Sequence, residues 1–135
     1  MALLNWSTKY SVGVQSMDTQ HKVLFGMLND LHEAMMKGQA QNVSDPLLRK
    51  LVSYTHDHFS AEEAMMASTG YQGIAQHRIE HRDLIKQVDE FASRCERGES
   101  NLNLQLLNFL RNWLTNHIQQ EDQKYGPWAN EHGRK

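Results

Sequence analysis

Long hydrophobic runs, cysteine and proline are all scarce in this chain of 135 residues. The longest largely apolar stretch, residues 102–114, contains Arg111 and several asparagines and is shorter than the roughly 20 residues that cross a bilayer. The first residues do not form the apolar segment of a secretory signal. A single cysteine, Cys95, excludes an internal disulfide and is compatible with a reducing compartment. We therefore expect a cytoplasmic protein without membrane insertion.

An excess of charge of either sign is also missing. Fourteen lysines and arginines stand against sixteen aspartates and glutamates, which gives a formal net charge of −2. Basic clusters of the kind that follow a phosphate backbone are not present in the sequence, so nucleic acid is not an expected partner. The length suits one domain over residues 1–135, with about two-thirds of the unfolded surface buried.

The few glycines fall mainly where four long periodic segments stop. Apolar residues recur three and four positions apart in each segment, and strand-like alternation is absent. This pattern predicts an all-α fold, an antiparallel up-down-up-down four-helix bundle over about residues 17–122. Residues 1–16 are expected to form an extended N-terminal arm on the bundle, and residues 123–135 a C-terminal tail.

Two boundary signals refine the predicted helices. Asp45 followed by Pro46 resembles an N-cap with proline at the first helical position. Ser100 and Asn101 can cap the fourth helix.

Polar residues interrupt the apolar stripe of every segment, and most of these are histidines. The interrupting residues are His21, His58, Glu62, His77, His81 and His117. A lone histidine on an apolar stripe is most often a hydrogen-bonded core residue. Here, however, burying so many polar groups unpaired would cost roughly 1 to 3 kcal/mol each. Imidazoles have few ways to pair with one another, whereas metal ions take up several nitrogen lone pairs and carboxylate charges together, so the pattern predicts a metal site.

The remaining histidines serve as an internal comparison. His32 and His56 lie off the stripes, and His132 follows the predicted bundle. We expect all three on the surface.

The fourth segment leaves its carboxylate undecided. Glu121 lies four residues after His117, where an ideal helix places it on the same face, whereas Asp122 lies five residues away and is rotated by about 140°. Periodicity alone favours Glu121. A π-bulge, which is frequent at functional sites, or a loosened final turn would bring Asp122 inward instead.

With these residues in view, the sequence resembles the hemerythrin family, in particular its stand-alone bacterial members. The resemblance covers nearly the whole chain and is carried by four motifs, one in each predicted helix. They are Asp18-Thr-Gln-His21, His58-Phe-Ser-Ala-Glu62, His77-Arg-Ile-Glu-His81 and His117-Ile-Gln-Gln-Glu-Asp122. The family's pattern of a histidine, four residues and an aspartate favours Asp122 over Glu121.

The resemblance implies a cofactor of two iron ions (Fe2+/Fe3+) joined by an oxo or hydroxo bridge. His77, His81 and His117 would hold one iron and His21 and His58 the other, with Glu62 and Asp122 bridging both. Five histidines on two metals leave the His21 and His58 side with a vacant position, where dioxygen is expected to bind. The residues that flank His117 in sequence, Trp113, Leu114 and Ile118, are candidates for an apolar dioxygen pocket, and Phe25 and Phe59 are further candidates.

These expectations lead to a function in reversible dioxygen binding, as a carrier, store or delivery protein rather than an enzyme. The candidate recipient of the gas is an oxygen-consuming enzyme. Two alternatives remain open, namely a di-iron enzyme acting on peroxide, nitric oxide or ferrous iron, and an oxygen sensor module.

Overall fold

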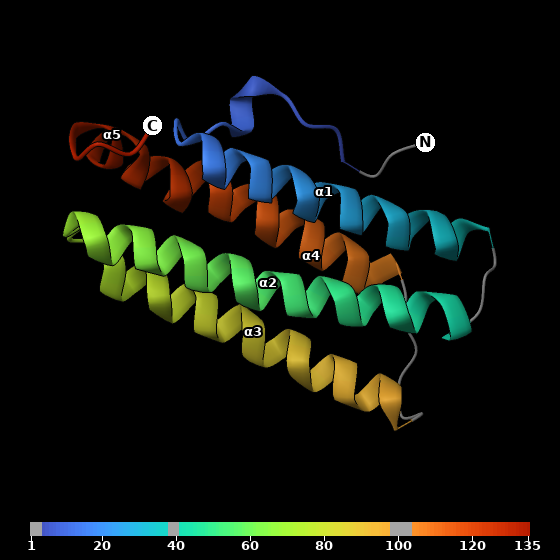
Figure 1. The fold of residues 1–135 in the computed structure, drawn as a ribbon. Helices are drawn as coiled ribbons and strands as arrows, with labels where there is room; N and C mark the ends of the chain where they lie inside the picture. Colours follow the sequence, from blue (N-terminus) through green and yellow to red (C-terminus); the bar gives the residue numbers. More distant parts are fainter. Residues whose placement is uncertain (1–3, 38–40, 98–103) are drawn as a thin grey trace.

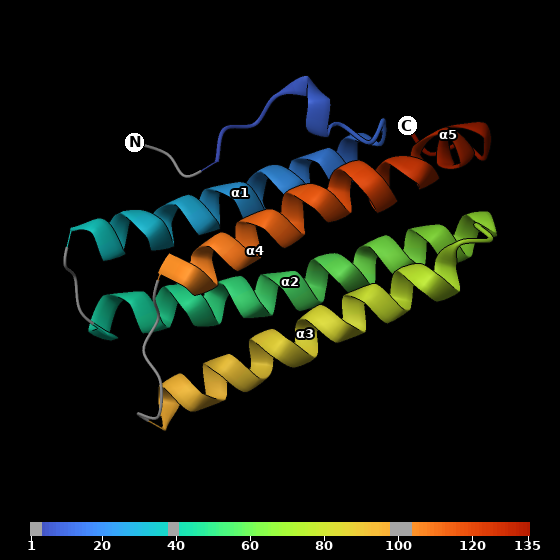
Figure 2. The same cartoon turned by 180° about the vertical axis from the view of Figure 1, so that it is seen from behind.

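Four long helices lie alongside one another in the computed structural model, which describes residues 4–37, 41–97 and 104–135 (Figure 1). They are α1 (Gln15–Met36), α2 (Gln41–Thr69), α3 (Ile74–Glu96) and α4 (Leu104–His117). Each runs opposite to the one before it, as the two views agree (Figure 2). The described residues contain no strand. The predicted all-α, antiparallel four-helix bundle is therefore confirmed.

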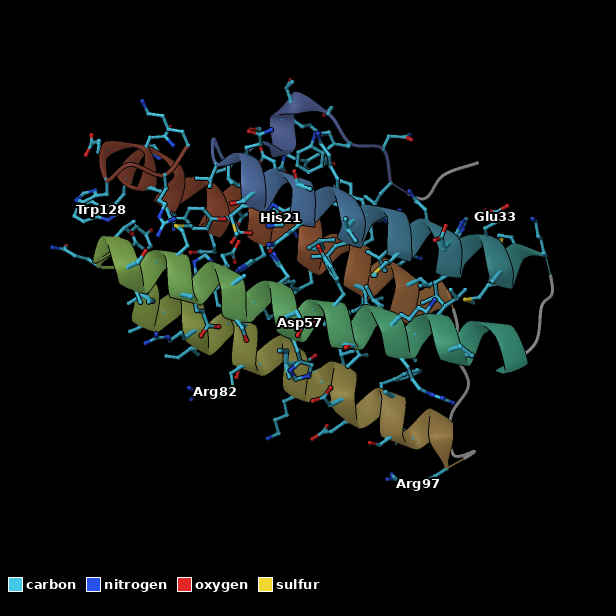
Figure 3. All side chains as sticks on the ribbon, viewed as in Figure 1. His21, Glu33, Asp57, Arg82, Arg97 and Trp128 are labelled. Atoms are coloured by element: carbon cyan, nitrogen blue, oxygen red, sulfur yellow. The ribbon has the colours of Figure 1, made fainter. Side chains whose placement is uncertain are left out.

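Helix α1 shows how the apolar spacing builds the core. Its buried residues follow one another at intervals of one, three or four: Met17, His21, Leu24, Phe25, Leu28, Leu31 and Ala34. This spacing directs a single face of the helix toward its neighbours. His21 consequently points between the helices, whereas Arg82 of α3 lies at the outside of the bundle (Figure 3).

The N-terminal arm packs on the bundle as expected. Leu4 and Asn29 exchange two hydrogen bonds of 2.8 Å between the backbone of the first and the side chain of the second. Asp18, in the first turn of α1, accepts hydrogen bonds from the Ser11 hydroxyl (2.6 Å) and the Val12 backbone N–H (2.8 Å). A short 3₁₀ helix, η1 (Thr8–Tyr10), lies within the arm. These contacts hold the arm, which precedes α1 in the chain, against the side of that helix.

Two predicted boundaries are wrong. Helix α2 begins at Gln41, so Pro46 lies inside the helix and Asp45-Pro46 does not mark its start. Residues 123–135 do not form a simple tail, because the chain continues from α4 through a π-helical turn, η2 (Ile118–Asp122), into α5 (Gln123–Glu131). Tyr125 and Ala129 of α5 are fully buried, and this burial stabilises a helix that short-range pattern does not reveal. The predicted cap at Ser100 and Asn101 lies outside the described residues.

Among the described helices, none has both the length and the apolar character that crossing a membrane requires.

Candidate metal centre

All seven side chains predicted as metal ligands meet at one level of the bundle. His21 comes from α1, His58 and Glu62 from α2, His77 and His81 from α3, His117 from the end of α4 and Asp122 from the end of η2. Each is buried, with at most 5% of its surface exposed. Four helices therefore converge on a polar cluster enclosed by an apolar core.

Three of the histidines form one set of donor atoms. The Nε2 atom of His117 lies 3.1 Å from Nε2 of His81 and 3.1 Å from Nε2 of His77. Oε1 of Glu62 lies 3.0 Å from His81 Nε2, and Oδ1 of Asp122 lies 2.7 Å from His77 Nε2. These five side chains offer ligand atoms that all lie within 4.8 Å of one another.

The other two histidines form a second set that shares the same carboxylates. Nε2 of His21 lies 3.1 Å from Oδ2 of Asp122 and 3.4 Å from Oε2 of Glu62. Nε2 of His58 lies 3.5 Å from Oε2 of Glu62. Each carboxylate thus directs one oxygen to the set of three histidines and the other oxygen to the set of two, as a bridging ligand must.

The donor atoms fit metal ions better than hydrogen bonds. The outer Nδ1 atoms of His81 and His117 face carboxylates, so in the neutral rings the Nε2 atoms carry lone pairs that point at each other. With a metal–nitrogen bond of about 2.1 Å, two ligands at a right angle lie about 3.0 Å apart, close to the observed 3.1 Å. Among the described residues, His21 Nε2, Glu62 Oε1 and Asp122 Oδ1 are buried without satisfying hydrogen-bond geometry. A pair of cations would satisfy all of them.

The π-helical turn decides between the two candidate carboxylates of the fourth segment. Residues Ile118–Asp122 form η2, and the wider turn rotates Asp122 inward, where 1% of its surface is exposed. Glu121 remains partly exposed and pairs with Lys124 at 3.4 Å. Of the two mechanisms considered for bringing Asp122 inward, the structure shows the π-bulge.

The electrostatics of the metal-free cluster are strongly perturbed. Burial disfavours the charged form of His21 and of His77, but the carboxylates of Asp122 and Glu62 more than offset it and raise the pKa to about 9 for His21 and about 10 for His77. Burial lowers the pKa of His58 to about 4, because its nearest carboxylate compensates only in part. Burial by itself would raise the pKa of Glu62, yet the surrounding histidines hold that pKa well below its ordinary value.

Three polar side chains that sequence reasoning missed contact the outer ring nitrogens. His81 Nδ1 lies 2.9 Å from Oε2 of Glu63, and His117 Nδ1 lies 3.2 Å from Oε1 of Glu80. His58 Nδ1 lies 2.6 Å from the amide oxygen of Gln20. Such contacts hold a ligating ring in one tautomer and orientation. The sequence offered one indication of these contacts, because Gln20, Glu63 and Glu80 each directly precede or follow a predicted ligand.

Tyr125 is a fourth residue of the site that the sequence did not predict. It is fully buried in α5, and its hydroxyl donates a 2.7 Å hydrogen bond to Oε2 of Glu62. Burial raises the pKa of the Tyr125 phenol well above its usual value, which keeps the group protonated as a donor. Its position three residues after Asp122 is the only sequence feature that connects it with the cluster.

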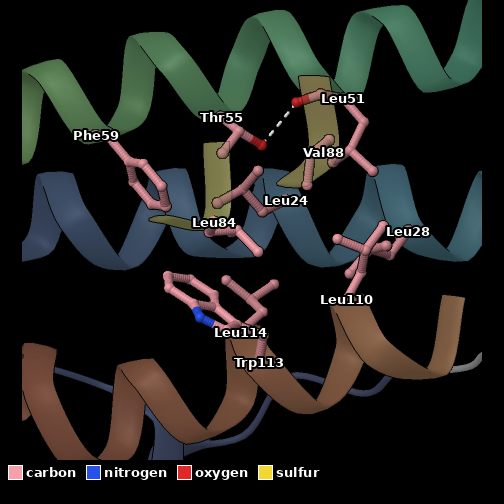
Figure 4. A pocket seen from close by; sticks show the side chains of 10 residues that line it. All are labelled: Leu24, Leu28, Leu51, Thr55, Phe59, Leu84, Val88, Leu110, Trp113 and Leu114. Atoms are coloured by element: carbon pink, nitrogen blue, oxygen red, sulfur yellow. Dashed lines mark hydrogen bonds between the residues drawn. The ribbon is translucent and has the colours of Figure 1, made fainter. Parts of the chain in front are cut away.

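An apolar cavity of about 30 Å³ lies beside the cluster, large enough for a molecule of about the size of water. Figure 4 shows the ten residues around it: Leu24, Leu28, Leu51, Thr55, Phe59, Leu84, Val88, Leu110, Trp113 and Leu114. Leu24, Thr55, Leu84 and Leu114 each lie three positions from a clustered histidine on the same helix. The cavity therefore occupies the next layer along the bundle axis. The single hydroxyl, that of Thr55, donates to the Leu51 carbonyl at 2.7 Å and leaves the wall apolar.

Of the five residues predicted to line a dioxygen pocket, three line this cavity and two do not. Phe59, Trp113 and Leu114 line the cavity. Phe59 stacks on His81 with ring centroids 3.7 Å apart, and Trp113 stacks on His117 at 4.4 Å. Phe25 instead contacts Trp6 and Tyr10 of the N-terminal arm, and Ile118 is buried at the start of η2. Neither Phe25 nor Ile118 belongs to the wall of this cavity.

The three remaining histidines stay outside the cluster. His56 is exposed and lies 3.3 Å from Asp89, and His132 is exposed and stacks on Trp128. His32 is half-buried and so differs from the expected surface position.

The architecture and the cluster define a class of protein, the antiparallel four-helix bundle with a buried histidine and carboxylate site suited to metal ions. Comparison with known proteins identifies the family within that class. The hemerythrin HHE cation binding domain family matches residues 12–129. The chain belongs to the hemerythrin family.

Individual relatives agree with this assignment over nearly the full length. A bacteriohemerythrin of Methylococcus capsulatus is 34% identical over 128 residues, which cover 94% of this chain and 97% of the relative. A bacteriohemerythrin of Stenotrophomonas maltophilia is 36% identical over 132 residues, covering 98% of this chain and 85% of the relative. The crystal structure of a wild-type hemerythrin superimposes with a TM-score of 0.91 at 33% identity, covering 95% of this chain and 98% of that chain.

Proposed function

We propose that this chain binds dioxygen reversibly at two iron ions held by His21, His58, Glu62, His77, His81, His117 and Asp122. The observation that carries the proposal is the division of the donor atoms. Three imidazoles and two imidazoles form separate sets, and both carboxylates contribute one oxygen to each set. Membership of the hemerythrin family supports iron as the metal.

The unequal sets support a gas-binding role. Five imidazoles give one metal position three histidines and the other two, so the His21 and His58 side has fewer protein ligands and is where dioxygen is expected to bind. The iron pair would supply the electrons for reversible binding, and a hydroxo bridge between the two ions would supply a proton. The chain contributes positioning, through the four helices, and exclusion of water, through the apolar layer that contains Phe59, Trp113 and Leu114.

The ligand chemistry favours a carrier over an oxidase. Di-iron oxidases on ferritin-like bundles rely mainly on carboxylates. In the cluster described here five of the seven side chains are histidines, which bind a metal ion as neutral imidazoles. We infer that this set stops short of the high-valent chemistry that carboxylate-rich sites support.

Anaerobic reconstitution with ferrous iron tests the proposal. We expect two irons per chain and an optical spectrum that changes on exposure to dioxygen and returns when the gas is removed. The proposal would be contradicted if the chain did not bind two irons, or if its oxidation by dioxygen were not reversed when the gas is removed. Steady turnover of peroxide or nitric oxide without reversible oxygenation would favour an enzyme.

A matched pair of variants on α2 links the result to the cluster. His58→Ala removes a buried ring of the two-histidine set, whereas His56→Ala removes an exposed ring two residues earlier. We expect His58→Ala to lose iron from one position and His56→Ala to retain both.

A further inference from the structure

The outer ring nitrogens on the three-histidine side contact negatively charged partners. Nδ1 of His81 donates to Glu63 at 2.9 Å, and Nδ1 of His117 donates to Glu80 at 3.2 Å. Glu63 and Glu80 lie on different helices, α2 and α3, and their side chains are 26% and 28% exposed. Two of the three imidazoles of this set are therefore hydrogen-bonded to carboxylates.

The two-histidine side has no such partner among the described residues. His58 Nδ1 contacts the neutral amide oxygen of Gln20 at 2.6 Å. His21 Nδ1 is buried and has no hydrogen-bond partner within the described part of the chain. The two sets differ in charge around their rings as well as in the number of rings.

The bridging position of Glu62 adds to the same asymmetry. Its Oε1, which faces His77 and His81 at 3.3 and 3.0 Å, is without a hydrogen-bond donor among the described residues. Its Oε2, which faces His21 and His58, accepts the 2.7 Å hydrogen bond from Tyr125. A donated hydrogen bond withdraws electron density from an oxygen, so Oε2 is the weaker electron donor of the two.

A carboxylate that accepts the outer N–H of an imidazole makes the inner nitrogen a more basic ligand. A more basic ligand stabilises the more highly charged state of a metal ion. We propose that Glu63 and Glu80, acting through His81 and His117, stabilise ferric iron at the three-histidine position, so that this iron is oxidised first and reduced last. The inference rests on the proposed di-iron function and assigns the order in which its two irons change charge.

A nearby positive charge affects how much Glu63 contributes relative to Glu80. Glu63 also pairs with Arg78 at 3.3 Å, and Arg78 offsets part of its negative charge. Both members of that pair reach solvent, so the offset is incomplete. Each carboxylate is expected to contribute, and loss of both should exceed loss of either.

Reductive titration of the iron-loaded chain tests the order. Protein loaded with ⁵⁷Fe is reduced stepwise under argon with redox mediators, while absorbance gives the two midpoint potentials and Mössbauer spectra count ferric and ferrous ions. Glu63→Gln and Glu80→Gln keep the shape of the side chain but remove its charge. We expect each to raise the lower midpoint potential, that of the three-histidine iron, more than the upper one.

Two further variants separate this effect from general electrostatics and from loss of folding. Gln20→Glu places a carboxylate on the two-histidine side and should lower the upper midpoint potential more than the lower. Glu121→Gln removes an equal charge close to Asp122, from a side chain that pairs with Lys124 and has no recorded contact with a ring nitrogen of the described histidines. It should move both potentials by similar, smaller amounts.

The outcomes distinguish this inference from the function beneath it. If the chain holds two irons and binds dioxygen reversibly, but the Glu→Gln variants move both potentials equally or the upper one more, the assigned order is wrong and the proposed function stands. The same conclusion follows if Gln20→Glu leaves the upper potential unchanged. If the wild-type chain does not hold two irons, both proposals fall together.

Discussion

Tyr125 shows at the scale of one residue how a side chain outside the histidine set supports it. Its buried hydroxyl donates to Glu62, and Phe would leave that carboxylate oxygen without the bond. Because hydrogen bonds to charged groups contribute about 1.5 to 3 kcal/mol, we expect Tyr125→Phe to lower the free energy of unfolding of the metal-free chain by about that amount. Urea denaturation followed by circular dichroism measures the change.

Tyr71→Phe is the control for this experiment. Tyr71 is half-buried and contacts the ring of Tyr125 with centroids 6.4 Å apart, yet its hydroxyl makes no hydrogen bond recorded among the described residues. We expect little change in stability. An equal loss in both variants would show that ring packing, and not the bond to Glu62, is responsible.

Leu114 is a second residue that matters singly, because it belongs to the apolar layer next to the polar cluster. It lies three residues before His117 and lines the cavity. Because a polar group there would admit water to the proposed iron site, we expect Leu114→Asn to accelerate autoxidation of the iron-loaded, oxygenated protein. The decay of the oxygenated spectrum measures the rate, with Leu114→Met as a control of similar volume. Unchanged decay in Leu114→Asn would exclude Leu114 from water exclusion.

The π-helical turn matters at the scale of the element, because it sets which carboxylate faces the core. Asp122 is buried at the end of η2, whereas Glu121 pairs with Lys124 near the surface. We expect Asp122→Ala to abolish binding of the iron pair and Glu121→Ala to retain two irons per chain, as measured by metal analysis after reconstitution. The reverse result would mean that the iron-loaded chain uses a regular α-helical turn.

Helix α5 and the N-terminal arm meet at Gly126. A Cβ at this position would overlap the backbone carbonyl of Val12, and Val12 itself is held by the hydrogen bond of its N–H to Asp18. We expect Gly126→Ala to destabilise the protein by about 1 to 3 kcal/mol, because neither backbone can move freely. Thermal unfolding measures the loss.

Gly26 in α1 provides the matched control. A Cβ there meets nothing within 4 Å, so Gly26→Ala should stabilise the helix by about 0.5 to 1 kcal/mol. Equal effects at the two glycines would show that helix propensity, rather than the contact between α5 and the arm, governs Gly126.

The buried cluster also shapes the pH dependence of the whole molecule. In the metal-free chain the pKa of His21 is about 9 and that of His77 about 10, both above the ordinary 6.5. Between pH 6.5 and these raised pKa values the folded chain therefore holds more protons than the unfolded chain. The stability that His21 and His77 contribute is fully present below pH 6.5 and is lost as the pH rises through 9 to 10. His58, with a pKa of about 4, has the opposite effect, so stability falls as the pH drops from 6.5 toward 4.

We consequently expect the metal-free chain to be most stable near pH 6.5. Metal ligands must be deprotonated, so bound metal replaces the protons and should remove most of the alkaline loss. Melting temperatures of chelator-treated and metal-loaded protein, measured across this pH range, provide the test. A metal-free chain whose melting temperature stays constant from pH 7 to pH 10 would contradict the assignment of His21 and His77.

The periodicity of the sequence was sufficient for the bundle and for six of the seven clustered residues. Burial of one face requires apolar residues three and four apart, and His21, His58, Glu62, His77, His81 and His117 interrupt that pattern at positions that must face inward. Their meeting at one level follows from the antiparallel arrangement of helices. A residue on a regular helix therefore reveals its direction from its spacing alone.

Only the tertiary structure decided two kinds of feature. One is a departure from regular helical spacing, and the other is a contact between segments that lie far apart in the sequence. The spacing favoured Glu121 and the family resemblance favoured Asp122. The structure shows how Asp122 comes inside, because the wider hydrogen bonding of the π-helical turn rotates the following side chain. The burial of Tyr125 and the approach of Val12 to Gly126 join the two ends of the chain. Glu63 and Glu80 stand next to predicted ligands in the sequence, but only the packing of the helices shows that each contacts an outer ring nitrogen on a neighbouring helix.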